Sequence, residues 1–355
     1  PLPQKVVEKL GDAWVKKENY VGNGAYKLAN HIINEKIEFE RNPLYWNDKE
    51  TVINSATFLA IENPSTDVAR YRAGDLDMTN YGLPPEQFAK LQKELPGEVY
   101  ITRTLATYSY ELNNKKAPFD NVNIRKALNL SLDRNVITDK VLGQGQTPTY
   151  VFTPTYIEEG HLIQQPAYSK EPMAQRNEEA IKLLEEAGYS KANPLKFTIL
   201  YNTNENHKKV AIAAASMWKA NTKGLIDVKL ENQEWKTYID SRRAGRYDAA
   251  RAGWNADYNQ ATTFGNYFLS NSSNNTAKYA NPEYDKAIAE SYVATDAEGR
   301  AKAYAKAEEI LAKDFGIVPI FNYVNPRLVK PYVKGYSGKD PQDHIYLRNL
   351  YIIKH

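Results

Sequence analysis

Apolar and polar positions along the chain repeat with two different spacings. Some segments place apolar residues about every three to four positions, which predicts amphipathic helices because such positions share one helix face. Typical helix starts precede several of these segments, at Asn177, at Asn281-Pro282 and at the capping box Thr295–Glu298. Other segments alternate or form short apolar runs, which predicts strands. The predicted strands are Tyr26–Ile33, Lys36–Arg41, Thr57–Ile61, Val99–Thr104, Tyr108–Asn113, Lys196–Tyr201, Val228–Asn232, Tyr247–Gly253 and Ile317–Val324.

A strand–helix–strand unit is predicted in the second half of the chain. Strand Leu195–Tyr201, helix Glu205–Asn221 and strand Ile226–Asn232 follow one another with short connections. Two strands joined through a helix are expected to lie parallel in one sheet. Together with the alternation of helical and strand periods elsewhere, this unit favours an α/β or α+β fold.

The chain length fits two domains, or one large one. With 355 residues, it is long enough for two compact bodies of ordinary size. We find no repeat, low-complexity segment or flexible linker that would separate them. We therefore expect two lobes that share close-packed connections.

Composition and charge exclude several classes of protein. The 46 basic and 43 acidic residues leave a net charge of +3, which is too balanced for a protein that binds nucleic acid by neutralising phosphates. No apolar run approaches the length of about 20 residues that a membrane span needs. The absence of cysteine excludes disulfides, thiol catalysis and Cys-ligated metals. The 26 Tyr and 5 Trp suit a ligand cleft, although Tyr spread over strands and surface explains them equally well.

Motifs of catalysis and of cofactor binding are not found. The five histidines are scattered, without the spacing of a local metal site. Neither a nucleophile-elbow motif nor a phosphate-binding loop occurs, and Gly143-Gln144-Gly145 lacks the third glycine of a dinucleotide fingerprint. The residues therefore predict neither an enzyme nor a bound metal or cofactor.

The segment Arg251–Asn259 carries the strongest local signal for a ligand site. It follows a predicted strand and presents Arg251, Gly253, Trp254 and Asp257 within a few positions. Strand alternation places Arg251 and Gly253 on one face and Trp254 on the other, unless a bulge intervenes. A strand end with these side chains is typical of a ligand-lining edge. The alternative is that Asp257 caps a turn and Trp254 fills a core.

Several motifs together resemble those of a known family. The chain resembles the peptide/nickel class of extracytoplasmic solute-binding proteins, and the resemblance spans essentially all of its length. The motifs that carry it occur in the same order as in that class: Asn23–Lys27, Ile37–Trp46, Tyr71–Asp77, Pro118–Ala127, Leu132–Arg134, Asp296–Arg300 and Ile317–Ile320. Within the class, Arg251–Asn259 and the region from Arg327–Pro331 to the end are most similar to periplasmic oligopeptide-binding receptors of ABC importers.

The resemblance implies an α/β, two-lobed periplasmic-binding-protein-like fold with two hinge crossings and a ligand cleft between the lobes. The first lobe would comprise residues 1–105 and 325–355, and the second, ligand-binding lobe residues 106–324. Family members carry a further N-terminal portion that this sequence does not match, so the first lobe is expected to be incomplete.

The resemblance also implies a function without catalysis. The expected protein is a monomeric receptor in the periplasm of a Gram-negative bacterium. It would capture short peptides in extended form and deliver them to an ABC permease in the inner membrane. An alternative on the same fold is a receptor for murein tripeptide or another peptide-like ligand, such as a metal chelate or haem.

The resemblance assigns roles to particular residues. Asp257 would bind the α-ammonium of the peptide, because a fixed carboxylate forms a charge-assisted bond with it. Arg251, Arg242 and His207 would bind the α-carboxylates of peptides of different length, with His207 contributing most when protonated. The other positions expected to face the ligand are Trp235, Trp254, Gly253, Asn255, Glu111, Asn80 and Tyr323. For each, the alternative is a structural role in a salt bridge or an aromatic core.

Three positions depart from the family pattern. Family members are expected to have a disulfide between the positions of Ala106 and Asn255, and both cysteines are absent here. A lysine associated with carboxylate binding falls at Leu142, and a tyrosine near the cleft is replaced by Ser109. These departures leave the preferred peptide length open.

Overall fold

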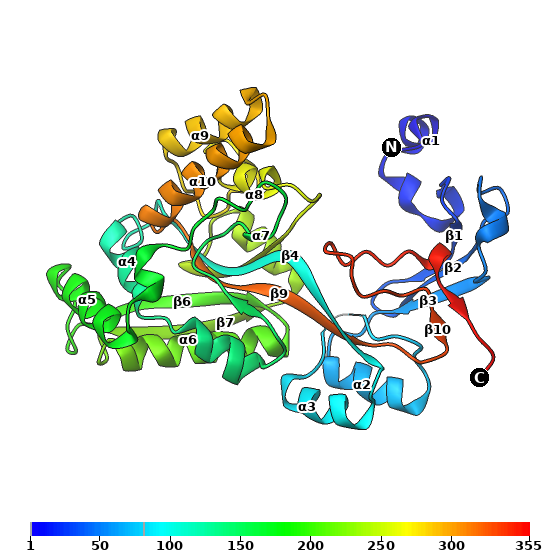
Figure 1. The fold of residues 1–355 in the computed structure, drawn as a ribbon, viewed down its shortest axis with the longest axis horizontal. Helices are drawn as coiled ribbons and strands as arrows, with labels where there is room; N and C mark the ends of the chain where they lie inside the picture. The colour runs from blue at the N-terminus through cyan, green and yellow to red at the C-terminus, as the bar shows by residue number, and fades with distance from the viewer. Residues whose placement is uncertain (1, 81) are drawn as a thin grey trace. The chain divides into compact units, whose positions relative to one another are not determined.

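A computed structural model describes residues 2–80 and 82–355. The chain divides into two compact units, unit 1 with Pro1–Tyr100 and Pro326–His355 and unit 2 with Ile101–Asn325. The backbone passes from one unit to the other within two long strands, β4 (Val99–Leu112) and β9 (Val318–Leu328), as Figure 1 shows.

Unit 2 is built on a six-stranded sheet with the order β5-β9-β4-β8-β6-β7. The remaining strands are β5 (Thr147–Pro148), β6 (Leu195–Asn202), β7 (Ile226–Gln233) and β8 (Ala249–Asn255). β6 pairs in parallel with β7 and with β8, whereas β8 pairs antiparallel with β4. The predicted strand–helix–strand unit is therefore confirmed as β6, α6 (Glu205–Asn221) and β7.

The prediction of two strands at Val99–Thr104 and Tyr108–Asn113 is wrong, because β4 is continuous through both segments. Burial alternates over the first residues of β4, whereas every residue from Leu105 to Leu112 is buried. The strand thus changes from one buried face to two, and this change removes the period of two that sequence patterns rely on.

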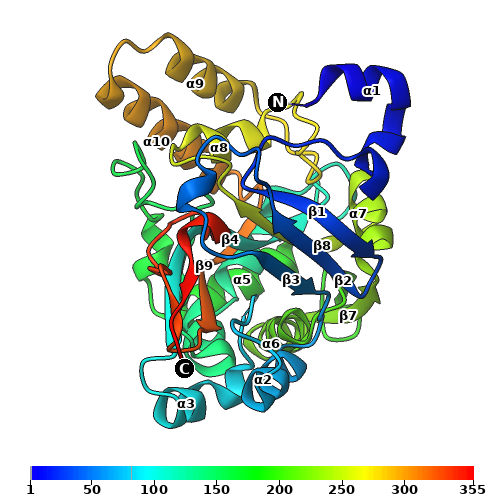
Figure 2. The same ribbon diagram turned by 90° about the vertical axis from the view of Figure 1, so that its right-hand side faces the viewer.

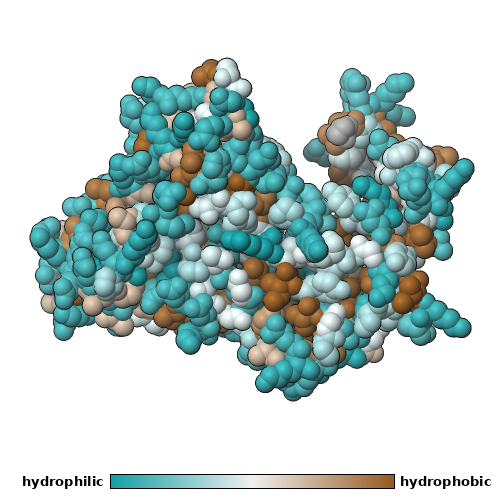
Figure 3. Space-filling view, in the orientation of Figure 1, coloured by the Kyte–Doolittle hydropathy of each residue, from teal (hydrophilic) through white to brown (hydrophobic). Residues whose placement is uncertain are grey.

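Helices surround the sheet of unit 2. α6 packs on β6 and β7, and α9 packs on α10, as Figure 1 shows. Hydrophilic side chains cover α5 and the α9–α10 pair on the face seen in Figure 3. The helices are α4 (Val122–Leu130), α5 (Met173–Glu186), α6, α7 (Trp235–Arg243), α8 (Thr262–Gly265), α9 (Pro282–Val293) and α10 (Ala297–Lys313), with shorter turns η4 (Val136–Leu142), η5 (Ala167–Lys170) and η6 (Asn266–Phe268).

Two of the predicted helix starts are corrected by the structure. α9 begins as predicted, with the Asn281 side chain accepting from backbone N–H groups and a proline at the first position. α10 is capped by Asp296 rather than Thr295, because the Asp296 carboxylate accepts from the N–H of Gly299 at 2.6 Å. α5 begins at Met173, ahead of Asn177, directly after the extended Pro172.

Two apolar cores stabilise unit 2. The larger core lies between the sheet and the helices α4 and α6, where Trp218 is fully buried and donates from its indole N–H to the Leu128 carbonyl at 2.9 Å. The second core contains Phe264, Phe268 and Leu311 from α8, η6 and α10. These cores form a rigid base for the loops at the end of β8.

Unit 1 contains a small antiparallel sheet and a separate helical core. In Figure 2, β1 (Tyr26–Ile32), β2 (Lys36–Arg41) and β3 (Ser55–Leu59) lie side by side in that order. Leu44 and Trp46, which follow β2, are 91% and 85% exposed. The other elements are α1 (Gln4–Leu10), α2 (Pro64–Ala73), α3 (Pro85–Glu94), the paired strands β10 (Val333–Lys334) and β11 (Tyr351–Ile352), and the turns η1 (Gly11–Val15), η2 (Lys17–Asn19), η3 (Asp48–Glu50) and η7 (Leu347–Asn349).

Neither a membrane-spanning helix nor a metal-binding cluster of side chains occurs among the described residues. Among the described helices, none has the length and apolar composition that a bilayer crossing requires. Within residues 2–80 and 82–355, no group of three or more His, Asp or Glu side chains is close enough together to hold a metal ion.

Candidate functional site

Strand β8 carries the predicted ligand edge, and its pairing with β4 determines which way each side chain points. Arg251 lies opposite Tyr110 and Gly253 opposite Tyr108, in a register without a bulge. Successive side chains of a strand point to opposite faces, so Arg251 and Gly253 share one face of the sheet and Trp254 lies on the other. The predicted alternation is confirmed.

On the first face, Arg251 is surrounded by polar and aromatic side chains of unit 2. It is buried, and it donates to the hydroxyl of Tyr323 at 2.5 Å and to Oδ1 of Asn202 at 3.4 Å. Its guanidinium carbon lies 5.1 Å from the centre of the Tyr108 ring. The hydroxyl of Tyr238 donates to the main-chain carbonyl of Arg251. These partners hold the guanidinium in place on this face of the sheet.

His207 is next to this cation on the same face. Its ring centre lies 5.6 Å from that of Tyr108, and the Asn204 side chain caps the start of α6 by accepting from its backbone N–H at 3.1 Å. Burial, together with the positive charge of Arg251, lowers the pKa of His207 well below its usual value. His207 is therefore neutral at neutral pH, whereas its expected contribution to carboxylate binding is greatest in the protonated form.

Gly253 permits the close approach of Arg251 and Tyr323. A Cβ atom at this position would lie 2.8 Å from the Tyr323 hydroxyl and 3.1 Å from Nη2 of Arg251. Both distances are shorter than ordinary van der Waals contacts. Any larger residue would push these two side chains apart.

On the second face, Glu111 and Arg242 form a buried ion pair at 3.0 Å. Tyr267 donates to Oε1 of Glu111 at 2.5 Å, Thr276 donates to Oε2 at 2.5 Å, and Nη2 of Arg242 donates to both hydroxyls. Burial alone would lower the pKa of Arg242, but the Glu111 carboxylate raises it well above its usual value. Two residues expected to face a ligand are thus each other's partners.

Trp254 near the end of β8 and Asp257 just beyond it lie beside Thr263 of α8. The half-buried Trp254 ring packs at 4.8 Å from that of Tyr267, and its indole N–H donates to the Thr263 carbonyl at 2.9 Å. Asp257 is exposed, and Oδ2 of its carboxylate accepts from the Thr263 hydroxyl at 3.3 Å. In the part of the chain that the structure describes, no cation forms an ion pair with Asp257.

The remaining predicted residues do not form part of these clusters. Trp235 begins α7 and is 54% exposed, with its ring stacked on that of Tyr238. Asn255 is exposed at the end of β8. Asn80 is exposed in unit 1.

The departures from the family pattern are also located. Ala106 and Asn255 are directly opposite each other on β4 and β8. Leu142 is buried in the larger core, and Ser109 is buried on β4.

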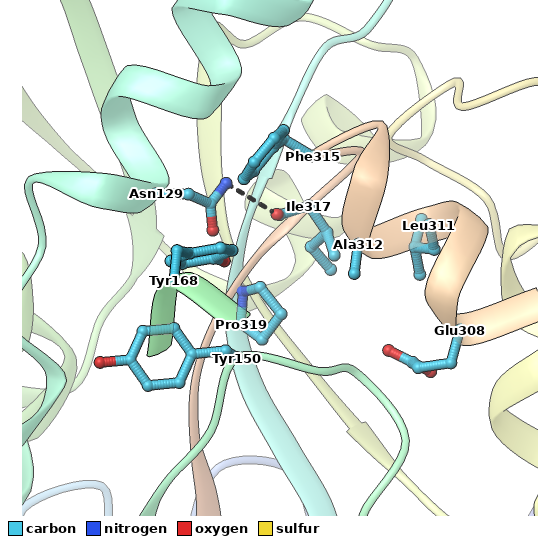
Figure 4. A pocket seen from close by; sticks show the side chains of 9 residues that line it. All are labelled: Asn129, Tyr150, Tyr168, Glu308, Leu311, Ala312, Phe315, Ile317 and Pro319. Atoms are coloured by element: carbon cyan, nitrogen blue, oxygen red, sulfur yellow. Dashed lines mark hydrogen bonds between the residues drawn. The ribbon is translucent and has the colours of Figure 1, made fainter. Parts of the chain in front are cut away.

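Segments other than β8 line two of the cavities among the described residues. Figure 4 shows one in unit 2, where Asn129, Tyr150 and Tyr168 are among the side chains that line about 10 Å³ of space, which is the size of one water. Glu308 at its edge accepts from the N–H groups of Phe152 and Thr153. The other, of about 350 Å³, lies in unit 1 and is lined by Tyr45, Asn47, Glu50, Thr51, Val52, Arg348, Asn349, Leu350 and Tyr351.

The family model of bacterial extracellular solute-binding proteins, family 5 Middle, matches residues 1–276. The chain belongs to this family. It is 97% identical over all 355 residues to the periplasmic oligopeptide-binding protein OppA of Haemophilus influenzae and covers 66% of that protein. It is 43% identical over 352 residues, 99% of the chain, to the periplasmic murein peptide-binding protein MppA of Escherichia coli and covers 65% of it. The chain thus spans about two thirds of the length of these relatives.

A solved structure of Haemophilus influenzae OppA in complex with RPPGFSPFR matches the whole chain. The TM-score is 0.97 with 97% sequence identity, over 69% of that chain. The predicted family and the predicted α/β fold class are confirmed by these matches. Family members are named for binding solutes rather than for catalysis.

The site also contains residues that sequence reasoning missed. Tyr238 and Tyr267 support Arg251 and the ion pair, whereas Thr263 and Thr276 complete the hydrogen bonds of Asp257 and Glu111. The abundance of tyrosine was a signal for the first two, although not for their positions. For the threonines, the sequence holds no local signal.

Proposed function

We propose that this chain is the peptide-binding part of a monomeric extracytoplasmic receptor. In this proposal the receptor captures short peptides in extended form in the periplasm of a Gram-negative bacterium and delivers them to an ABC permease of the inner membrane. The observation that carries the proposal is the exposed carboxylate of Asp257 directly beyond β8, together with the Arg251 cation on that strand.

The backbone of β8 supports an extended ligand. The backbone N–H of Ala256 donates to the Leu105 carbonyl of β4. In an antiparallel pair, residues whose main-chain groups bond to the partner strand alternate with residues whose groups point away from it. By this alternation, the main-chain groups of Gly253 and Asn255 point away from β4. On that side the described residues of β6 pair with β8 at Ala249 and Ala250 alone. The strand beyond Arg251, whose own carbonyl accepts from Tyr238, can therefore accept an added peptide strand.

The two ends of a peptide carry charges that every peptide shares. The Asp257 carboxylate would receive the α-ammonium in a charge-assisted hydrogen bond. Arg251 would bind an α-carboxylate, and the neutral His207 beside it would donate a hydrogen bond rather than supply a charge. Recognition of backbone and charged ends is independent of side-chain sequence.

Three predicted groups have different parts in this proposal. Trp235 and Trp254 would form walls of side-chain pockets, and Asn80, Asn255 and Tyr323 would contact the ligand or its waters. We propose that Glu111 and Arg242 act indirectly, because their charges already compensate each other and their network supports the ring under Trp254.

Peptides of general sequence are favoured over murein tripeptide by similarity. Identity is 97% to a protein named for binding oligopeptides and 43% to one named for binding murein peptide. The solved complex with RPPGFSPFR supports the same preference.

Mass spectrometry of ligand released from purified protein tests the proposal. The chain would be expressed at the full length of its relatives, without added peptide, and the ligand released by denaturation. A mixture of short peptides of varied sequence is expected. A single murein-derived species would support the alternative. In a separate incubation of the purified protein with peptides, their cleavage would indicate an enzyme. Either of these results would refute the proposed function.

A further inference from the structure

The hydroxyl of Thr263 connects Asp257 to Trp254. Thr263 is the second residue of α8 and is 4% exposed. Its Oγ1 donates to Oδ2 of Asp257 at 3.3 Å and accepts from the Asp257 backbone N–H at 3.1 Å. It also accepts from the indole N–H of Trp254 at 3.3 Å, which donates to the Thr263 carbonyl at 2.9 Å as well.

These contacts use the full hydrogen-bonding capacity of the hydroxyl. A threonine hydroxyl has one donor hydrogen and two acceptor lone pairs. The hydrogen is directed to the Asp257 carboxylate, and the lone pairs face the two N–H groups. One carboxylate oxygen of Asp257 is thereby held, while no described residue forms a hydrogen bond with the other, Oδ1.

The turn from Asp257 to Thr263 is anchored at a second point. Nε2 of Gln260 donates to Glu159 at 3.0 Å, and Glu159 is held by Arg300 of α10 at 2.6 Å. The carbonyl of Glu158 accepts from the N–H of Ala261 at 3.1 Å. The backbone of the turn is therefore also anchored by contacts that do not involve Thr263.

We propose that Thr263 is a positioning residue for the amino end of the peptide. It holds the Asp257 carboxylate in one orientation, with Oδ1 available to an α-ammonium, and it holds the Trp254 ring beside it. This inference rests on the proposed function. A carboxylate that is already ordered loses less conformational entropy when the ligand binds, so Thr263 raises the affinity specifically for a free amino terminus.

The test compares three variants made in a chain of the full length of the relatives. Thr263→Val keeps the shape but removes the hydroxyl, and Thr263→Ser keeps the hydroxyl. The matched control is Thr262→Val. Thr262 is equally buried, but its hydroxyl contacts Gln260 and Tyr258 instead of Asp257.

Each variant is titrated calorimetrically with RPPGFSPFR and with its N-acetylated form. The measured quantity is the dissociation constant of the acetylated peptide divided by that of the free-amino peptide. A general loss of stability does not change this ratio. We expect Thr263→Val to reduce this ratio roughly three- to tenfold, the amount that ordering one side chain contributes. Thr263→Ser and Thr262→Val should keep the wild-type ratio.

Two results would overturn the inference in distinguishable ways. If the wild type prefers the free amine and Thr263→Val shows the same preference, Thr263 has no positioning role, whereas the proposed function stands. If the wild type binds both forms equally, the amino-end role of Asp257 fails and this inference fails with it. If Thr263→Val melts below the assay temperature, Thr263→Ala takes its place with the same expected ratio.

Discussion

The buried pair of Glu111 and Arg242 makes a sharp prediction about stability. We consider three proteins: Glu111→Gln, Arg242→Met and the double variant. Glu111→Gln removes the negative charge and leaves the shape nearly unchanged. Arg242→Met removes the positive charge and keeps an unbranched side chain in its place.

The expected magnitude follows from the burial of the two charges. The side chains are 0% and 11% exposed, and Arg242 Nη2 contacts Glu111 Oε2 at 3.0 Å. Removing one member of such a pair leaves an uncompensated buried charge, which lowers the free energy of unfolding by about 3–5 kcal/mol. Removing both charges costs less than the sum of the single changes, with a coupling energy of about 2 kcal/mol or more.

Urea unfolding followed by tryptophan fluorescence measures these free energies. Trp254 packs on Tyr267, which donates to Glu111, so its emission reports on this network. The control is the exposed pair Lys306 and Glu290, at 3.1 Å with both side chains more than 40% exposed. Glu290→Gln should change the free energy of unfolding by less than about 1 kcal/mol. Strict additivity of the Glu111 and Arg242 changes would refute the assignment of a buried, mutually dependent pair.

Three further outcomes are expected. Gly253→Ala should weaken peptide binding, because its Cβ would clash with the Tyr323 hydroxyl, and calorimetry showing unchanged affinity would contradict that contact. The double variant Ala106→Cys/Asn255→Cys should form a disulfide, because the two positions are a non-hydrogen-bonded cross-strand pair. Its oxidised form should melt at a higher temperature than its reduced form, with about 2–4 kcal/mol of stabilisation. Persistent free thiols would show the register of β4 and β8 to be wrong. His207 has a lowered pKa in the folded state, so the unfolded state binds more protons than the folded state below about pH 6.5. The free energy of unfolding should therefore decrease as the pH is lowered through this range, by up to about 1.4 kcal/mol per pH unit. Urea titrations of His207→Gln should show a smaller slope, and a slope equal to the wild type's would exclude His207 as its source.

Elements with a local signal were predictable from the sequence. The Leu195–Asn232 unit has apolar runs around a helix whose Asn204 cap accepts two backbone N–H groups, and it forms β6, α6 and β7. The faces of Arg251 and Trp254 follow from strand alternation, which holds because β8 has no bulge.

What depends on distant contacts was not predictable. Glu111 and Arg242 are separated by 131 positions, and no local pattern shows that they pair with each other. The continuity of β4 depends on burial on both faces by other segments. His207 of α6 shows the same limit, since its charge state depends on burial and on the cation Arg251 of strand β8.

Binding of free-amino and N-acetylated forms of one peptide to the wild type and to Asp257→Asn is the most direct test of the proposed recognition of the peptide's amino end. Asparagine keeps the size of the side chain and removes only the charge that is expected to attract the ammonium group. We predict that the wild type prefers the free amine by about tenfold or more, and that Asp257→Asn abolishes most of this preference while it binds the acetylated form nearly unchanged. An equal loss of affinity for both forms, or a preference that survives the substitution, would contradict the account.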